Sequence, residues 1–249
     1  MTDTRKGKGS SGRSYRTDAG ITKIPKKQKN RSESSRRWIQ RQLNDPFVAE
    51  AKARGFRSRA GLKIEQIDQK HNIFFRGASV LDLGCAPGGW LQYAANKIGL
   101  EEGHGRLVGI DLLVTDPIPG ADILVGDIND DAMLAEMIRL MDGKADIVLS
   151  DMAADTTGHR PTDHLRTTAL LELAIDMGLR ILNPGGSFLA KCFRGGAERE
   201  ALEVMRKNFT TVRHVKPAAS RQESVESYVL ATGFRGVNTN SGADEPAHR

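Results

Sequence analysis

The sequence has few cysteines and no long apolar run, and each absence excludes a class of protein. Only two of its 249 residues are cysteine, Cys85 and Cys192, too few for the disulfide framework of a small secreted protein, so we expect two buried thiols. No apolar run approaches the ~20 residues that a membrane-spanning helix needs, and no apolar segment follows the basic residues at the N-terminus. We therefore expect a cytoplasmic protein with no membrane span and no secretory signal.

Acidic residues are scarce at the start of the chain. Residues 1–37 hold 12 Lys or Arg against 3 acidic residues, a net charge of +9, whereas residues 38–249 hold 25 basic and 28 acidic residues, a net charge of −3. The first segment is also rich in Gly, Ser and Thr, so it cannot bury enough apolar surface to offset its ordering entropy. We expect a disordered basic arm that attracts nucleic-acid phosphates. A solubility tail without a specific partner is the alternative.

Strand and helix patterns alternate through the rest of the chain. The predicted strands are residues 80–83, 106–111, 122–125, 145–150, 186–193, 211–216 and 227–234, and the helices between them are 89–98, 130–141, 162–182 and 197–208. This alternation predicts an α/β, Rossmann-like domain over residues 38–235, with a seven-stranded mostly parallel sheet and helices on both faces. The last two strands are too close for a crossover helix, so one of them runs antiparallel. Residues 236–249 are expected to form a disordered tail.

Residues 79–92 combine a short apolar strand, a glycine turn and the start of a helix, which is typical of a nucleotide-like ligand site. The turn has neither the G-x-G-x-x-G spacing of a dinucleotide site nor the lysine of a P-loop. S-adenosylmethionine, which has no phosphates, fits better. Asp111 ends the next apolar run, residues 107–110, and Asp127 follows the run 123–126, where they would accept hydrogen bonds from the ribose hydroxyls and the adenine amino group. A cap or turn role is the alternative for each aspartate alone.

Two further strands end in charged residues that are expected to be neighbours, Asp151 and Lys191. A charge at the end of a buried strand is costly unless it is paired or used, and a structural salt bridge is the alternative to a catalytic role. S-adenosylmethionine donates methyl groups, and enzymes that methylate the amino group of a nucleic-acid base commonly have an Asn-Pro-Pro-Tyr type segment. The chain lacks such a segment. Methyl transfer to a pyrimidine carbon requires a cysteine nucleophile beside proline or threonine. Cys192 does not fit this pattern, because it lies between Lys191 and Phe193.

Five segments in order give the chain a resemblance to a known family over roughly residues 35–235. They are Ser58-Arg59-Ala60-Gly61-Leu62-Lys63, Asp82-Leu83-Gly84-Cys85-Ala86-Pro87-Gly88-Gly89-Trp90, Ser150-Asp151-Met152-Ala153, Ala190-Lys191, and Lys216-Pro217-Ala218-Ala219-Ser220-Arg221 followed by Ser224, Glu226 and Tyr228. The chain resembles the FtsJ (RrmJ) family of ribosomal RNA 2′-O-ribose methyltransferases. The resemblance implies methylation of a uridine ribose in large-subunit ribosomal RNA.

The resemblance also implies the functional residues. It assigns a catalytic tetrad to Lys63, Asp151, Lys191 and Glu226, and contacts with S-adenosylmethionine to Gly88, Trp90, Asp111, Asp127 and Asp151. A ribose hydroxyl is a poor nucleophile and the sulfonium methyl is already activated, so the enzyme must align the two and remove one proton. Lys191 would be the base if its amine is partly neutral, which burial and a neighbouring cation favour.

No metal is needed for this chemistry, and the histidines show no ligand spacing. We expect a monomer that binds ribosomal RNA or the large ribosomal subunit. Two alternatives stay open. One is a 2′-O-methyltransferase of transfer or messenger RNA. The other is a ribosome-assembly factor without turnover.

Deleting residues 1–37 tests the basic arm. We expect weaker RNA binding and a flatter dependence of affinity on salt, because each lost phosphate contact lowers the slope of log K against log salt by about 0.7 for single-stranded nucleic acid. The measurement is the RNA dissociation constant of both chains over a series of salt concentrations. Unchanged affinity and slope would leave the arm as a solubility tail.

Overall fold

The computed structural model describes residues 36, 39–40, 43–154, 157–195, 198–221 and 224–236. The chain divides into two units, Met1–Pro46 and Phe47–Arg249, and the fold described below belongs to the second. The predictions of a disordered basic arm and of a disordered C-terminal tail fall almost wholly outside the described residues. In the described part of the chain, no helix is both long enough and apolar enough to cross a membrane.

A seven-stranded sheet in the order β3-β2-β1-β4-β5-β7-β6 forms the centre of the domain. Its strands are β1 (Ser79–Leu83), β2 (Arg106–Asp111), β3 (Asp122–Val125), β4 (Ala145–Ser150), β5 (Leu182–Phe193), β6 (Phe209–Val215) and β7 (Glu226–Phe234). The first five are parallel to one another, whereas β7 is antiparallel to both β5 and β6. The predicted fold class is therefore confirmed, including the single antiparallel strand at the end of the chain.

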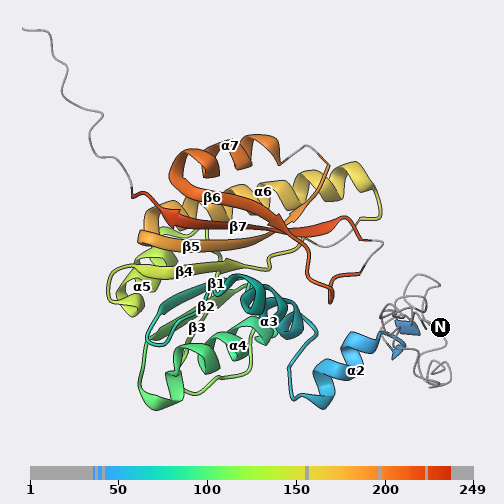
Figure 1. Ribbon diagram of the computed structural model, residues 1–249, viewed down its shortest axis with the longest axis horizontal. Coiled ribbons are helices and arrows are strands. Elements are labelled where there is room, and N and C mark those ends of the chain that lie inside the picture. The colour runs from blue at the N-terminus through green and yellow to red at the C-terminus, as the bar shows by residue number, and fades with distance from the viewer. Residues whose placement is uncertain are drawn as a thin grey trace, which may run out of the picture. The chain divides into compact units, whose positions relative to one another are not determined.

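Helices cover both faces of this sheet (Figure 1). The helices after residue 45 are α2 (Pro46–Ala53), α3 (Ala60–His71), α4 (Gly89–Ile98), the short 3-10 helix η2 (Leu100–Glu102), α5 (Asp131–Met141), α6 (Arg160–Ile181) and α7 (Arg199–Asn208). α3 and α4 lie on one face, and α5, α6 and α7 lie on the other. The turn signals in the sequence account for several ends: Gly99 stops α4 with φ of 75°, and the Asp130 carboxylate caps α5 by accepting from the Ala132 N–H.

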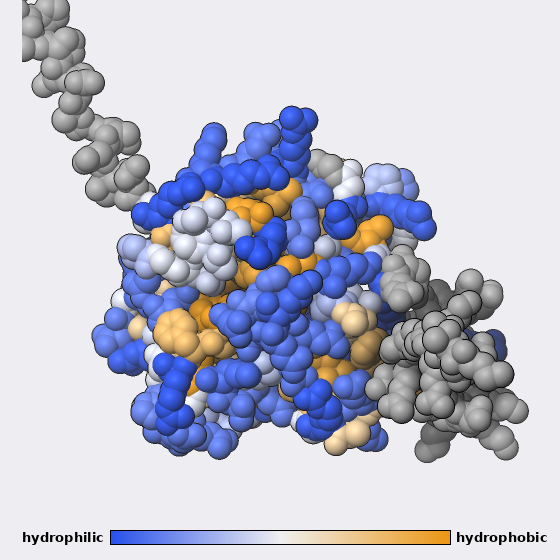
Figure 2. All heavy atoms as spheres, viewed as in Figure 1, coloured by the Kyte–Doolittle hydropathy of each residue, from blue (hydrophilic) through white to orange (hydrophobic). Residues whose placement is uncertain are grey.

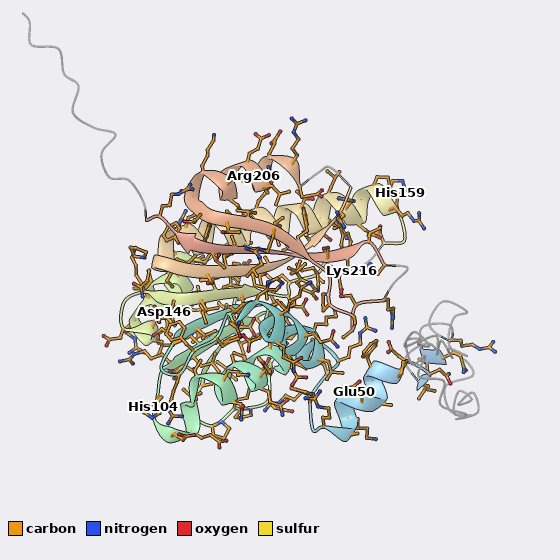
Figure 3. The ribbon with its side chains drawn as sticks, in the orientation of Figure 1. Glu50, His104, Asp146, His159, Arg206 and Lys216 are labelled. Carbon is orange, nitrogen blue, oxygen red and sulfur yellow. The ribbon has the colours of Figure 1, made fainter. Side chains whose placement is uncertain are left out.

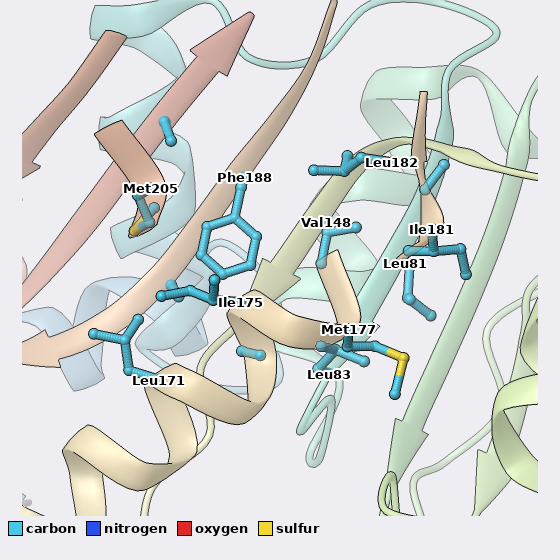
Figure 4. Packing of buried hydrophobic residues seen from close by; sticks show 14 of the residues in the cluster. Leu81, Leu83, Val148, Leu171, Ile175, Met177, Ile181, Leu182, Phe188 and Met205 are labelled. Atoms are coloured by element: carbon cyan, nitrogen blue, oxygen red, sulfur yellow. The ribbon is translucent and has the colours of Figure 1, made fainter. Parts of the chain in front are cut away.

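Two apolar clusters hold these layers together, one on each face of the sheet. Leu81 and Leu83 of β1 pack toward α5 and α6, and Figure 4 shows them with Val148, Ile175 and Phe188 in that layer. Val80, directly before Leu81, belongs instead to the cluster under α3 and α4. Side chains alternate between faces along a strand, so one short apolar strand supplies both cores.

One predicted boundary was wrong, because β5 begins at Leu182 rather than at residue 186. Leu182 is fully buried and pairs with Ala145 of β4, and the register then shifts before Ser187 pairs with Ile147. Pro184 and Gly185 lie within this irregularity of the strand, where the ladder is interrupted and proline and glycine are tolerated.

α3 is fixed firmly to α4, which matters because α3 carries a predicted catalytic residue. The buried Asp68 carboxylate accepts hydrogen bonds from the N–H groups of Ile73 (2.8 Å) and Phe74 (3.0 Å), which follow the helix. Its other oxygen accepts from the Tyr93 hydroxyl of α4 at 2.8 Å. The bond from Tyr93 joins α3 to α4, and Lys63 is buried on the same helix.

The surface is mainly hydrophilic on the face seen in Figure 2, where apolar side chains form small separate areas. This distribution agrees with a mean hydropathy of −0.43. The largest run of exposed apolar residues in the described part of the chain is Leu112, Leu113 and Val114, directly after β2.

Substituting Leu91→Ala tests the packing of α4 on the sheet. Leu91 is fully buried, so its truncation should lower the free energy of unfolding by ~2–5 kcal/mol through lost burial and a residual cavity. Leu165→Ala is the control, because Leu165 lies 65% exposed on α6 and should change stability by less than ~0.5 kcal/mol. Urea denaturation of both variants gives the comparison. Equal effects would mean that α4 does not depend on this contact.

Candidate active site

Most of the predicted functional residues come from the carboxyl ends of parallel strands. These are Asp111 of β2, Asp127 after β3, Asp151 after β4 and Lys191 near the end of β5. Parallel strands of one sheet end at the same edge, which is where ligands of α/β proteins bind. Figure 3 places His159 and Lys216 near this edge and Asp146, at the start of β4, at the opposite one.

The glycine turn between β1 and α4 has no room for side chains. Gly84 and Gly88 have φ of 75° and 97°, a conformation that residues with a side chain rarely adopt. A Cβ at Gly84 would collide with Met152, and one at Gly88 would lie 2.6 Å from the Arg57 guanidinium. The turn therefore exposes backbone rather than side chains, and the N-terminus of α4 begins directly after it at Gly89.

Asp111 and Asp127 lie at the ends of β2 and β3, where the sequence predicted them. One Asp111 oxygen accepts from the Ala86 N–H of the glycine turn (2.8 Å) and the other from the Leu113 N–H (2.9 Å). The Asp127 carboxylate accepts from the backbone and side-chain N–H groups of Asn129, and these bonds hold the pKa of its carboxyl below the usual value. Both carboxylates remain accessible as acceptors for a ligand.

Trp90 has a different role from the one that a cofactor contact would suggest. Its side chain is buried, its indole N–H donates to the Ala60 carbonyl at 2.9 Å, and its ring packs on Tyr228 at 5.6 Å. A ligand at the turn can therefore meet only the backbone of Trp90. The indole instead holds α3 against the start of α4.

The four predicted tetrad residues come together as two ion pairs. The Lys63 ammonium lies 2.7 Å from Glu226, and the Lys191 ammonium lies 2.8 Å from the Asp151 carboxylate. Lys191 also donates to the Asp151 carbonyl at 2.8 Å. The partners of each pair come from elements far apart in the sequence, and all four side chains are largely buried.

Tyr228 connects the two pairs, a role that the sequence motifs did not assign. Its hydroxyl accepts from the Lys63 ammonium and donates to Asp151, both at 3.0 Å. Tyr228 also pairs with Lys191 across the β5–β7 ladder. The period of two along a strand could have indicated it, because Tyr228 lies two residues after Glu226 and shares its face. Ser220, also unassigned, donates to Glu226 at 2.8 Å.

The electrostatics of the cluster keep both carboxyl groups ionised. Burial by itself raises the pKa of Asp151, but the ammonium groups of Lys191 and Lys63 and the Tyr228 hydroxyl outweigh it and lower that pKa below the usual value. Burial also opposes ionisation of Glu226, and Lys63 again outweighs it, so its pKa is lowered as well. Burial and the two carboxylates raise the pKa of Tyr228, which keeps its proton for the bond to Asp151.

The cysteines are buried, as predicted, and neither is a reactive thiolate. Burial is the main reason why the pKa of Cys85 and that of Cys192 are both raised to about 12, and thiolate chemistry requires a lowered pKa. Within the described ranges, no three His, Cys, Asp or Glu residues are grouped to hold a metal ion.

Several basic residues around α3 are engaged within the fold. Arg54 pairs with Glu65 at 2.6 Å, and Arg57 donates to the carbonyls of residues 116 and 117, both at 2.6 Å. Lys63 belongs to the tetrad cluster. Lys52, at the end of α2, is exposed. Cations that are close in sequence thus take separate structural roles.

The geometry selects one kind of ligand for the glycine turn. Backbone N–H groups flanked by carboxylates suit an adenosyl group with free hydroxyls, and a buried carboxyl under the turn, Asp82, has no hydrogen-bond partner among the described residues. Such a carboxyl favours a ligand with a positive charge, and S-adenosylmethionine carries one at each of two atoms. The fold and this site define an S-adenosylmethionine-dependent methyltransferase.

Comparison with known proteins gives the family. The profile of the FtsJ-like methyltransferases matches residues 56–234, and the chain belongs to this family. The matched range contains all four tetrad residues and every predicted cofactor residue.

Similar proteins cover most of the chain. Ribosomal RNA large subunit methyltransferase E of Xanthobacter autotrophicus is 54% identical over 211 residues, which are 85% of this chain and 83% of that one. The protein of the same name from Parvibaculum lavamentivorans is 49% identical over 244 residues, 95% and 96% of the two chains. A crystal structure from Plasmodium falciparum, described as a ribosomal RNA methyltransferase, has a TM-score of 0.63 at 30% identity and covers 73% of this chain and all of its own.

Substituting Lys63→Met tests the charge balance of the cluster. Because the folded-state pKa of Asp151 and of Glu226 is lowered, these groups stabilise the fold above the ordinary carboxyl pKa of about 4, and this stability is lost as the pH falls. Removing the cation leaves Glu226 buried without its partner, so stability at neutral pH should fall by ~3–5 kcal/mol. The loss should shrink on acidification, as Glu226 becomes protonated.

Urea unfolding of the variant and the wild type between about pH 3.5 and 7 measures this difference. Arg139→Met is the matched control, because Arg139 pairs with Glu136 on the exposed surface of α5. The control should have the same pH dependence as the wild type. A Lys63→Met deficit that is independent of pH would contradict the proposed charge balance.

Proposed function

We propose that this protein transfers a methyl group from S-adenosylmethionine to the 2′-hydroxyl of a ribose in large-subunit ribosomal RNA, a uridine by the resemblance described above. The observation that supports this most directly is the convergence of Lys63, Asp151, Lys191 and Glu226 beside the glycine turn. The relatives named ribosomal RNA large subunit methyltransferase E support the substrate class. Its substrate would be met in the cytoplasm, and the chain would act there as a monomer.

The protein's own side chains form no covalent bond to the substrate in this reaction. The bound cofactor supplies a methyl group already activated on a sulfonium. The chain's residues must hold the ribose hydroxyl in line with that methyl and accept one proton from it. Backbone at Gly88 and Trp90, with Asp111 and Asp127, would hold the cofactor.

We assign to Lys191 the role of the general base, which accepts the proton of the ribose hydroxyl. An ammonium has no lone pair, so Lys191 must release a proton before it accepts one from the hydroxyl, and Asp151 beside it would orient the resulting amine. Lys63 is held between Glu226 (2.7 Å) and the Tyr228 hydroxyl (3.0 Å). It would act by fixing those groups and by placing a second positive charge near Asp151.

Lys191→Ala should abolish methyl transfer and leave cofactor binding nearly unchanged. Loss of a general base lowers the rate by about 10²–10⁴-fold. Lys191→Arg should be equally inactive, because a guanidinium keeps the charge but does not give up its proton. Lys144→Ala is the control, since Lys144 is exposed directly before β4, at the opposite edge of the sheet. Its transfer rate should equal that of the wild type.

The assay uses large ribosomal subunits, and the RNA extracted from them, from cells that lack this protein. Methyl incorporation is mapped to the 2′-oxygen, and transfer RNA is tested in parallel. Activity retained in Lys191→Arg would reduce Lys191 to an electrostatic role. Methyl incorporation into transfer RNA alone would overturn the assignment of ribosomal RNA as the substrate. No incorporation by the wild type in a single turnover would favour a ribosome-assembly factor.

A further inference from the structure

A carboxyl group is buried in β1 without a hydrogen-bond partner in the described part of the chain. Asp82 is fully buried, and neither of its carboxyl oxygens has a hydrogen-bond partner among the described residues. In the sheet it lies between Gly109 of β2 and Leu149 of β4. A buried, unpaired carboxylate is among the most costly groups that a fold can contain.

Its position places Asp82 under the glycine turn rather than in the core of the opposite face. Leu81 and Leu83, on either side of it, belong to the cluster under α5 and α6, so Asp82 faces the α4 side. At its neighbour Gly109, an added Cβ would lie 2.9 Å from Leu91 of α4 and 3.0 Å from the Cys85 sulfur. The turn and the start of α4 therefore lie directly over this carboxyl.

The ionisable groups near Asp82 make its ionisation less favourable. From the two flanking strands these are Asp151 and Asp111, both carboxyls, and together with burial they raise the pKa of Asp82 well above the usual value. From the turn comes the Cys85 thiol, which is neutral because its pKa is about 12. The cation on α3, Lys63, is bound to Glu226 and Tyr228. The residues named from α4, Trp90 and Leu91, carry no charge.

Three carboxyl groups thus surround the turn, those of Asp82, Asp111 and Asp151. The lysines of the tetrad pair with Asp151 and with Glu226, and not with Asp82 or Asp111. The ribose is assigned to Asp111 and the adenine to Asp127, which leaves the amino-acid end of the cofactor for the turn. That end carries an α-ammonium group. An ammonium placed there supplies the positive charge that Asp82 lacks within the protein.

We propose that Asp82 is the counter-charge for the α-ammonium of S-adenosylmethionine, and that binding of the cofactor expels a proton from Asp82 to solvent. Without ligand the group is a neutral carboxylic acid. With ligand it is a carboxylate stabilised by the nearby cation. Cofactor affinity then depends on pH through a residue that takes no part in the methyl transfer.

The test is calorimetric titration of the protein with S-adenosylhomocysteine, which retains the α-ammonium, and with methylthioadenosine, which lacks it. At one pH, buffers of different ionisation enthalpy report the number of protons released. We expect release to approach one proton for S-adenosylhomocysteine and none for methylthioadenosine. Above the ordinary carboxyl pKa of about 4 the affinity for the first should rise with pH, by at most tenfold per unit, and that for the second should stay constant.

Asp82→Asn should bind S-adenosylhomocysteine more weakly and without proton release, and it should bind methylthioadenosine like the wild type. Asp142→Asn is the matched control, since Asp142 is exposed after α5, and it should release the proton as the wild type does. Equal proton release with the two ligands in the wild type would overturn the proposal, even if the Asp82 variant does not fold. No RNA is present, so the result is independent of the proposed substrate.

The ligand-free protein gives a second measurement. Because the folded-state pKa of Asp82 is raised, unfolding releases a proton, and this group's contribution to stability falls as the pH rises above the unfolded pKa of about 4. Asp82→Asn should therefore be more stable than the wild type at neutral pH, with a difference that shrinks on acidification. A variant less stable at every pH would mean that Asp82 is structural.

Discussion

The hydroxyl of Tyr228 makes one network of two ion pairs that would otherwise be separate. It accepts from Lys63 and donates to Asp151, so each of its hydrogen-bonding functions is used by a charged partner. Buried ion pairs repay their desolvation only when their remaining donors and acceptors are also satisfied. Here two ammonium groups face two carboxylates with a neutral phenol between them. The cluster is therefore neutral in net charge, although each of its members is expensive to bury.

The antiparallel strand explains how this network reaches the cofactor edge. Parallel strands bring their last residues to that edge, which accounts for Asp151 and Lys191. An antiparallel strand brings its first residues there, and Glu226 is the first residue of β7. Lys63 arrives from α3 on one face of the sheet, held by Trp90 and Asp68. Reversal of one strand thus adds a carboxylate that parallel topology would have placed at the far edge.

The glycine turn differs from the neutral tetrad cluster, because the carboxyl groups around it outnumber the cations that the protein pairs with them. Asp82, Asp111 and Asp151 lie around it, and only Asp151 has a lysine partner. Local rules of stability are commonly broken at functional sites, and the group that breaks them here lies beneath the proposed position of a cationic ligand. The same backbone has no room for side chains at Gly84 and Gly88. The residues that lack a compensating charge within the protein are therefore the ones proposed to bind the ligand.

The sequence by itself determined the order of elements, because apolar periodicity and turn residues are local. It predicted the mostly parallel sheet, the antiparallel end, the burial of both cysteines and the strand-end positions of Asp111 and Lys191. The start of β5 was missed, since Pro184 and Gly185 occur in turns and in strand irregularities alike. Only the tertiary structure decided that Trp90 packs inward, that Tyr228 joins the ion pairs and that Asp82 has no hydrogen-bond partner among the described residues. Each of these depends on contacts between residues far apart in the chain, and no local pattern encodes such contacts.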